Sequence, residues 1–187
     1  MFIIKNNYYL IIENTSDIDL KNIKKSKKFF IIYRNNSTKE DIIKLINFKK
    51  QCNQRCFKLY IANDYQLAKI CKADGLYISS HNKKIYLNKN LNLIGSAHNF
   101  NEIYQKIKQG CKTIILSRLF KTTYKNKKNF LGTIKFNLIK KNYVFNIVPL
   151  GGINGLNLLK LNLVNSKGFV LMSEIKKKPV ITNRLFW

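Results

Sequence analysis

Short apolar runs alternate with amphipathic segments along the whole chain, and this alternation limits the fold more than any other feature of the sequence. The runs are continuous rather than alternating in polarity, as expected for strands covered on both faces of a parallel sheet. Eight such strands close a (β/α)8 barrel, so we predict an α/β fold of the TIM-barrel type, with a doubly wound open sheet as the rival fold. The predicted strands are Tyr8–Ile12, Lys28–Tyr33, Lys58–Ala62, Gly75–Ile78, Asn92–Ser96, Thr113–Ser117, Tyr143–Val148 and Gly168–Met172.

The segments between these strands have the sequence patterns of helices, but two of the segments are short. Ser37 and Glu40 form a capping-box pattern at the start of a helix predicted over Ser37–Lys50. A short first helix at Asp17–Lys24, and the few residues Lys83–Leu91 between strands four and five, predict a trimmed barrel. No repeat or linker divides the chain, and we expect residues 1–187 to form a single domain. The remaining helices are predicted at Asp64–Cys71, Asn99–Gln109, Thr133–Lys140 and Asn154–Leu163.

The charge of the chain is extreme, since 35 Lys and Arg face nine Asp and Glu, for a formal net charge of +26. The lysines are spread through every segment rather than gathered into a stripe, and we attribute part of the excess to nucleotide bias. Nucleic-acid binding is therefore not favoured, whereas an attraction for phosphorylated small molecules is expected. Four cysteines are too sparse for a disulfide framework, no apolar run reaches the roughly 18–20 residues of a membrane span, and no signal-peptide pattern is present. We expect a cytoplasmic protein with no membrane partner, and a homo-oligomer stays open.

A double glycine marks the most distinctive strand end. Gly151 and Gly152 follow the apolar stretch Tyr143–Val148, and the next predicted strand ends at Ser173. Glycine amides and the free N–H groups of a following helix form a cradle for anions, and parallel barrels bind phosphate in the loops after strands seven and eight. The pattern indicates a phosphate site, with a tight turn without ligand as the alternative.

Polar residues also follow the other predicted strands, where a parallel barrel carries its functional groups. This contrast with the apolar strands behind them favours a small-molecule site. Plainer interpretations stay open: Asn63-Asp64 and Ser173 as helix caps, His98 as a cap or surface residue, and Lys125 as part of a solvated loop. The strand-end residues are Arg34, Asn63, Asp64, Ser79 to Asn82, Ser96, His98, Ser117 to Lys125, Gly151, Gly152 and Ser173.

Five sequence blocks, in order, resemble the thiamine phosphate synthase and thiazole tautomerase family of small (β/α)8 barrels. The similarity extends from about Tyr8 to Ile175. The blocks are Ile61-Ala62-Asn63-Asp64 with Ala73 to Ile78, Ile94 to His98, Leu119 to Lys125, Gly151-Gly152-Ile153, and Gly168 to Ile175.

The resemblance implies a synthase that joins a pyrimidine methyl diphosphate to a thiazole phosphate and releases diphosphate, with Mg²⁺ as cofactor. The chain departs from the family pattern at Asn82, where the family has a second metal-binding aspartate, and also at Ile32 and Asn36. By position, the resemblance implies that Arg34, Ser96 and Lys125 hold diphosphate, Asn63 contacts the pyrimidine, Asp64 and Asn82 form the metal site, Thr122 lies in the thiazole-side loop, and Gly151, Gly152 and Ser173 bind the thiazole phosphate.

Two further functions remain open at this stage. A tautomerase-like or salvage relative would bind thiazole phosphate without the metal step and use His98 to transfer a proton. A non-catalytic phospholigand or RNA-binding protein would instead depend on the lysines. The apolar ending Ile181–Trp187 is expected to pack under the barrel or against a second subunit.

Overall fold

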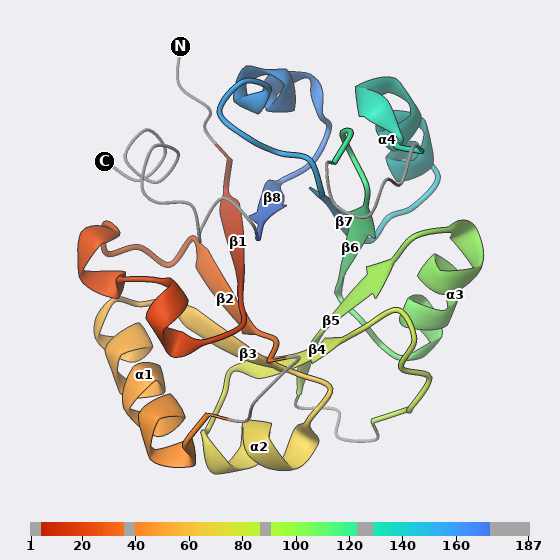
Figure 1. Cartoon of the computed structure of the whole chain (residues 1–187). Helices are drawn as coiled ribbons and strands as arrows, with labels where there is room; N and C mark the ends of the chain where they lie inside the picture. Colours follow the sequence, from red (N-terminus) through yellow and green to blue (C-terminus); the bar gives the residue numbers. More distant parts are fainter. Residues whose placement is uncertain (1–4, 36–39, 87–90, 123–128, 173–187) are drawn as a thin grey trace.

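Eight parallel strands form a closed barrel in chain order, and β1 pairs with β8 to complete it (Figure 1). The computed structural model describes residues 5–35, 40–86, 91–122 and 129–172. The predicted (β/α)8 barrel is confirmed, and the open sheet is excluded. The strands are β1 (Asn7–Ile12), β2 (Phe29–Tyr33), β3 (Lys58–Ala62), β4 (Gly75–Ile78), β5 (Asn92–Ala97), β6 (Thr113–Ser117), β7 (Asn146–Leu150) and β8 (Gly168–Leu171).

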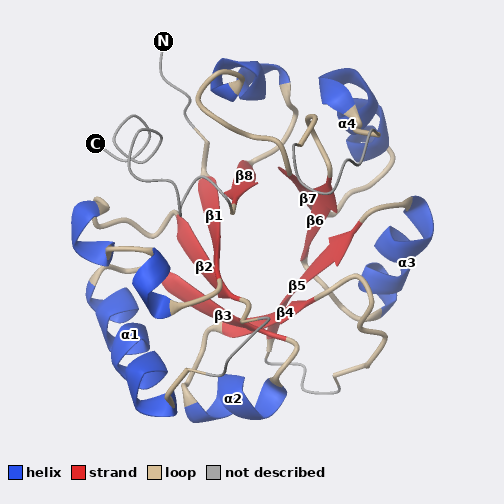
Figure 2. Cartoon of the chain, in the orientation of Figure 1, coloured by secondary structure: helices blue, strands red, loops and turns tan. Residues whose placement is uncertain are grey.

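Helices surround the barrel on the outside, and several are reduced (Figure 2). Short 3₁₀ turns, η1 (Thr15–Asp17) and η2 (Leu20–Asn22), stand where the first helix was predicted, and η4 (Leu158–Leu163) follows β7. Among the described residues between β4 and β5 there is no helix. The trimming predicted from the sequence is therefore observed. The α-helices are α1 (Ile42–Gln54), α2 (Tyr65–Ile70), α3 (Phe100–Lys108) and α4 (Gly132–Lys141).

The start of α1 differs from the prediction. Asp41 is the N-cap and accepts a hydrogen bond from the Ile43 N–H at 3.0 Å. The Glu40 carboxylate instead accepts bonds from the N–H and hydroxyl of Thr15, so it connects η1 to the residues before α1 rather than closing a capping box. Ser37 lies outside the described residues.

Strand β7 lies further along the chain than predicted, at Asn146–Leu150 instead of Tyr143–Val148. Val144 is fully exposed, because residues 143–145 connect α4 to the strand. The shift places Leu150 at the carboxyl end, beside Ser117 of β6.

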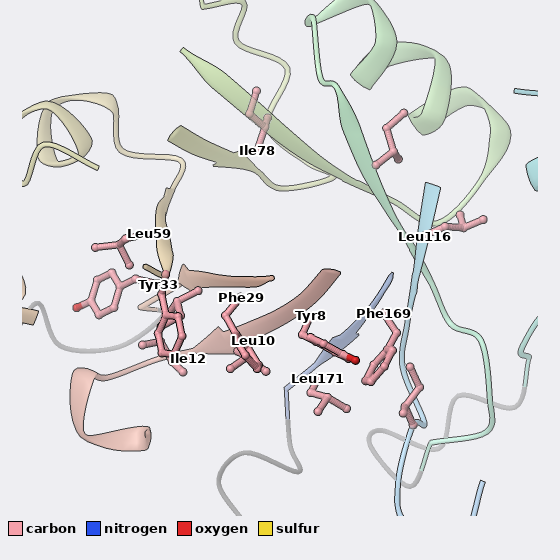
Figure 3. Packing of buried hydrophobic residues seen from close by; sticks show 14 of the residues in the cluster. Tyr8, Leu10, Ile12, Phe29, Tyr33, Leu59, Ile78, Leu116, Phe169 and Leu171 are labelled. Atoms are coloured by element: carbon pink, nitrogen blue, oxygen red, sulfur yellow. The ribbon is translucent and has the colours of Figure 1, made fainter. Parts of the chain in front are cut away.

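Alternate residues of each strand face two different cores. One side packs against the helices, where Tyr8, Phe29 and Phe169 form an aromatic cluster with ring centroids 5.3–5.5 Å from Tyr8 (Figure 3). The other side fills the barrel interior, as in other small parallel barrels. The interior residues are Tyr9, Ile11, Ile32, Tyr60, Tyr77, Ile94, Ile115, Val148 and Val170.

The amino ends of the strands are closed by structural contacts. Tyr9 bonds there with Thr113 and Asn146, and the Asn146 amide donates to the Thr113 hydroxyl at 3.1 Å. Asp74, before β4, pairs with the buried Lys49 of α1 and accepts the Leu59 N–H at 2.7 Å, so it serves a structural role. No helix of the described residues is long and apolar enough to cross a membrane.

Candidate functional site

Arg34, Tyr77 and Ser96 meet at the carboxyl end of the barrel, although Arg34 follows β2 and the other two residues lie on β4 and β5. Tyr77 is almost fully buried, and its hydroxyl interacts with the side chains of Ser96 and Arg34. Burial raises the pKa of Tyr77, while the hydrogen bonds and the Arg34 charge oppose that rise. The tyrosine therefore stays neutral and holds the guanidinium and the Ser96 hydroxyl in one place.

A second polar group connects the ends of β3 and β4. Asn63, at φ 59°, directs its Oδ1 to the Ser79 N–H at 2.9 Å and to the Asn82 amide at 3.1 Å. The Asn82 amide also donates to the Tyr86 hydroxyl at 3.1 Å. The two asparagines predicted for the pyrimidine and metal sites thus contact each other directly.

The predicted metal ligands serve other contacts. Asp64 is the N-cap of α2, and its Oδ1 accepts the Leu67 N–H at 2.9 Å, as expected for a helix cap. Asn82 directs its amide nitrogen toward Asn63, and its Oδ1 accepts the Lys84 N–H at 2.9 Å. Within the described ranges, no cluster of three His, Cys, Asp or Glu that could hold a metal ion is found. This donor set does not fit a two-ligand magnesium site, because Mg²⁺ prefers carboxylate oxygens and Asn82 presents an engaged amide.

Behind this loop lies a buried pair of polar residues that the sequence analysis did not single out. Lys106 of α3 is fully buried, and its ammonium donates to the carbonyl oxygens of Ser79 at 2.7 Å and Asn82 at 2.8 Å. Gln109 donates to the carbonyls of Asn82 at 3.0 Å and Lys84 at 2.7 Å. The only feature of the sequence that points to this burial is spacing, because Lys106 lies three residues after Ile103, which is itself buried.

His98 and Ser117 form a pair at the ends of β5 and β6. The Ser117 hydroxyl lies 2.7 Å from His98 Nδ1, and Glu102 accepts the His98 backbone N–H at 2.7 Å. His98 is exposed, while Ser117 is half-buried. The contact gives the predicted proton-transfer residue a partner that the sequence analysis named only as part of a longer loop.

The double glycine packs against the segment that follows β6. A Cβ on Gly152 would lie 2.5 Å from the carbonyl oxygens of Phe120 and Lys121, and one on Gly151 would lie 2.9 Å from the Arg118 side chain. Both glycines have positive φ, 100° and 69°. Close backbone approach therefore explains the two glycines without a ligand, although the turn still lies at the predicted end of the barrel.

Two other predicted residues can be located only in part. Thr122 is half-buried, and its hydroxyl accepts a bond from Arg118 Nη1 at 3.4 Å. Lys125 and Ser173 lie outside the described residues, as does the ending Ile181–Trp187. The Leu150–Val170 pairing nevertheless makes the ends of β7 and β8 neighbours.

A cavity of about 370 Å³ lies at the opposite end of the barrel. Lys5, Lys140, Asn146 and Lys167 are among its lining residues, at the amino ends of β1, β7 and β8. Parallel barrels carry their active residues at the carboxyl ends, so we assign the candidate site to the rim of Arg34, Asn63, Ser96 and His98.

The closed parallel barrel and its polar carboxyl rim define a TIM-barrel protein with its candidate site in the strand-to-helix loops. A family model described as thiamine monophosphate synthase matches residues 9–175. The chain belongs to this thiamine monophosphate synthase family, which confirms the resemblance seen in the sequence.

Individual relatives agree with that assignment. A thiamine-phosphate synthase from Prochlorococcus marinus subsp. pastoris is 29% identical over 134 residues, which cover 69% of this chain and 38% of that protein. The match thus spans well under half of the relative's length.

Solved structures show the fold. The thiamine phosphate pyrophosphorylase of Pyrococcus furiosus superposes with a TM-score of 0.76 at 14% identity, covering 96% of this chain and 91% of that one. The corresponding protein of Bacteroides thetaiotaomicron gives a TM-score of 0.60 at 13% identity, covering 97% and 90%.

Proposed function

We propose that this chain is a divergent thiamine phosphate synthase, a transferase of thiamine biosynthesis acting as a single barrel domain over residues 1–187. It joins a pyrimidine methyl diphosphate to a thiazole phosphate and releases diphosphate. The family match supports this function, and the observation that carries it is the meeting of Arg34 and Ser96 at the Tyr77 hydroxyl. A cation and a hydroxyl held together at the carboxyl rim are suited to a phosphorylated substrate.

In the proposed reaction, the bond between the pyrimidine methylene carbon and the diphosphate oxygen breaks, and its electron pair leaves with the diphosphate. The thiazole nitrogen then donates its lone pair to the resulting pyrimidine cation. Arg34 and Ser96, with Lys125 beyond the described residues, hold the departing diphosphate. Fixed donors of this kind stabilise developing negative charge without reorganising.

The other predicted residues position the two substrates. Asn63 contacts the pyrimidine, and its bonds to Ser79 and Asn82 fix the orientation of its amide. Thr122, Gly151, Gly152 and Ser173 hold the thiazole phosphate in the loops after β6, β7 and β8. Bringing the nucleophile to a fixed position replaces a bimolecular encounter by an intramolecular step.

The test is an assay of the purified chain with the pyrimidine methyl diphosphate and thiazole phosphate, with and without Mg²⁺. We expect diphosphate and thiamine phosphate in equal amounts, and a loss of at least about 100-fold in kcat/KM for Arg34→Gln. Lys69→Gln, at an exposed position of α2, serves as the charge-matched control and should keep the wild-type rate. No diphosphate release under either condition, or an unchanged rate in Arg34→Gln, would remove the synthase assignment.

A second candidate function is proton transfer on a thiazole phosphate, and the His98–Ser117 contact favours it. A hydroxyl on Nδ1 fixes the orientation of the imidazole, which suits a general acid or base. Tautomerisation of the thiazole phosphate without diphosphate release, lost in His98→Gln, would establish this function instead. If synthase turnover persists in His98→Gln, the synthase reaction does not require the His98–Ser117 pair.

A further inference from the structure

The Lys106 ammonium is a fixed charge inside the protein. Its side chain is fully buried, and its three donors meet three acceptors: the Ser79 carbonyl at 2.7 Å, the Asn82 carbonyl at 2.8 Å and Gln109 Oε1 at 2.9 Å. An ammonium has three N–H donors and no acceptor, so this arrangement satisfies the protonated form completely. Burial lowers the pKa of Lys106, while Cys111 and Glu102 act against that shift.

Gly95 of β5 leaves the space that the buried lysine side chain occupies. A Cβ on Gly95 of β5 would lie 2.8 Å from Cγ and Cδ of Lys106. A larger residue at position 95 would displace the lysine stem from the face of β5. Glycine on the strand and lysine on the helix therefore form a matched pair.

The contacts of Lys106 all lead to the end of β4. Its two carbonyl partners, Ser79 and Asn82, begin and end the same turn, in which the Asn82 N–H donates to the Ser79 carbonyl at 3.1 Å. The same turn supplies the Ser79 N–H and the Asn82 amide to Asn63. A positive charge thus lies directly behind the turn that orients Asn63, the residue that contacts the pyrimidine in the proposed function.

We propose that Lys106 is a positioning residue that replaces a divalent cation at this rim: it holds the Ser79–Asn82 turn and supplies a fixed positive charge that favours an anionic diphosphate over a metal ion at Asn82. This inference rests on the proposed function for its ligand. Two features act in the same direction, because the rim has an amide rather than a carboxylate at position 82 and a buried cation at 2.8 Å from the Asn82 carbonyl. Like charges in a poorly solvated region repel strongly, so Lys106 opposes metal binding there.

The test measures metal binding directly, with Mn²⁺ as a paramagnetic probe in the presence of inorganic diphosphate. Broadening of the backbone amide signals of Asn63, Asp64 and Asn82 reports Mn²⁺ at this rim. We expect the Asn82→Asp and Lys106→Met double variant to bind Mn²⁺ at least about tenfold more tightly than wild type. The matched control combines Asn82→Asp with Lys108→Met, which removes an exposed lysine of the same helix, 4.6 Å from the Tyr104 ring, and should gain much less.

Loss of Lys106 removes one donor from each of its three acceptors and leaves Gln109 Oε1 without the donor that the structure shows for it, so a folded comparison is also needed. In Asn82→Asp alone, the buried ammonium remains behind the turn, and its charge should keep the gain in Mn²⁺ affinity below tenfold. Lys106→Arg keeps the charge and should also leave Mn²⁺ affinity low, which a purely structural role would not require. A tenfold gain in Asn82→Asp alone, or equal affinity in wild type and the double variant, overturns the proposal.

The activity assay separates this inference from the proposed function. Diphosphate release that depends more than tenfold on Mg²⁺ in the wild-type chain would refute the role of Lys106 and leave the synthase assignment standing. If no turnover is seen but the variants bind Mn²⁺ with the expected affinities, the synthase assignment is refuted and the role of Lys106 is supported.

Discussion

Tyr77 connects two proposed diphosphate ligands, so its hydroxyl matters more than its ring. Tyr77→Phe keeps the buried aromatic ring and removes the atom that Arg34 and Ser96 share. We expect kcat/KM to fall by about 10- to 100-fold, while the free energy of unfolding falls by no more than about 1.5 kcal/mol. Steady-state kinetics and urea denaturation measure the two effects.

Tyr60→Phe is the matched control, because Tyr60 is a second buried tyrosine of the barrel interior. It should leave kcat/KM within about twofold of wild type, as it removes no group from the Arg34 side of the rim. Equal losses in the two variants would mean that barrel packing, rather than the shared hydroxyl, controls the rate.

Asp64 allows its helix-capping role to be separated from its charge. Asp64→Asn retains an oxygen for the Leu67 N–H, whereas Asp64→Ala removes the cap. We expect Asp64→Ala to lower the free energy of unfolding by about 1 kcal/mol and Asp64→Asn by no more than about half of that. Thermal and urea denaturation of the two variants test the difference, and equal destabilisation would show that the charge, not the cap, stabilises α2.

At the level of elements, the turn after β7 is held by its contact with the loop after β6. Gly152→Ala adds a Cβ 2.5 Å from two carbonyl oxygens, at φ 69°, so both contact and conformation oppose it. Gly132→Ala has nearly the same φ of 70° but meets nothing within 4 Å. We expect Gly132→Ala to cost roughly 1–2 kcal/mol from the left-handed conformation alone, and Gly152→Ala to cost at least about 2 kcal/mol more. Similar losses in chemical denaturation would refute the close approach.

The sequence predicts elements well where polarity alone defines them. The bounds of β3, β4 and β6 are those expected from the apolar runs, whereas β7 begins three residues later than predicted. The stretch 143–145 is as apolar as a strand, but its residues pair with no neighbour, and pairing is not visible in local composition. The helix start at Asp41 was missed for a related reason, since Glu40 is engaged by the distant Thr15.

The candidate site was predictable as a set of strand ends, but its internal contacts were not. Arg34, Asn63 and Ser96 follow from polarity at the carboxyl rim. The Asn63–Asn82 bond joins residues 19 positions apart, and Lys106 bonds to a carbonyl 24 positions away. A lysine in a helix is usually read as exposed, so only the structure shows that this one is buried against Gly95.

At the scale of the whole molecule, the two ends of the barrel differ in chemistry. Aromatic and amide contacts of Tyr9 and Asn146 close the amino end of the interior, while hydroxyls, amides and cations line the carboxyl rim. The core between the barrel and its helices contains two buried thiols, Cys52 of α1 and Cys111, which precedes β6.

These thiols predict how the stability of the molecule depends on pH. Burial raises the pKa of both Cys52 and Cys111 to about 12, from an ordinary value of 9.0. Above pH 9 the unfolded chain releases thiol protons that the native chain retains, so stability present below pH 9 is lost as pH rises toward 12. Each thiol should remove about 1.4 kcal/mol from the free energy of unfolding between pH 8 and pH 10.

Urea denaturation at the two pH values tests this expectation by comparison of variants, so that contributions from lysines and tyrosines cancel. The Cys52→Ala and Cys111→Ala variants are less stable than wild type at pH 8, because each leaves a small cavity. Each should nevertheless lose about 1.4 kcal/mol less than wild type on going to pH 10. Leu45→Ala, which opens a cavity in the same helix as Cys52 and removes no ionisable group, is the control and should keep the wild-type difference between the two pH values. If the two buried-thiol variants lose as much stability as wild type over this interval, ionisation of these thiols does not limit the alkaline stability of the barrel.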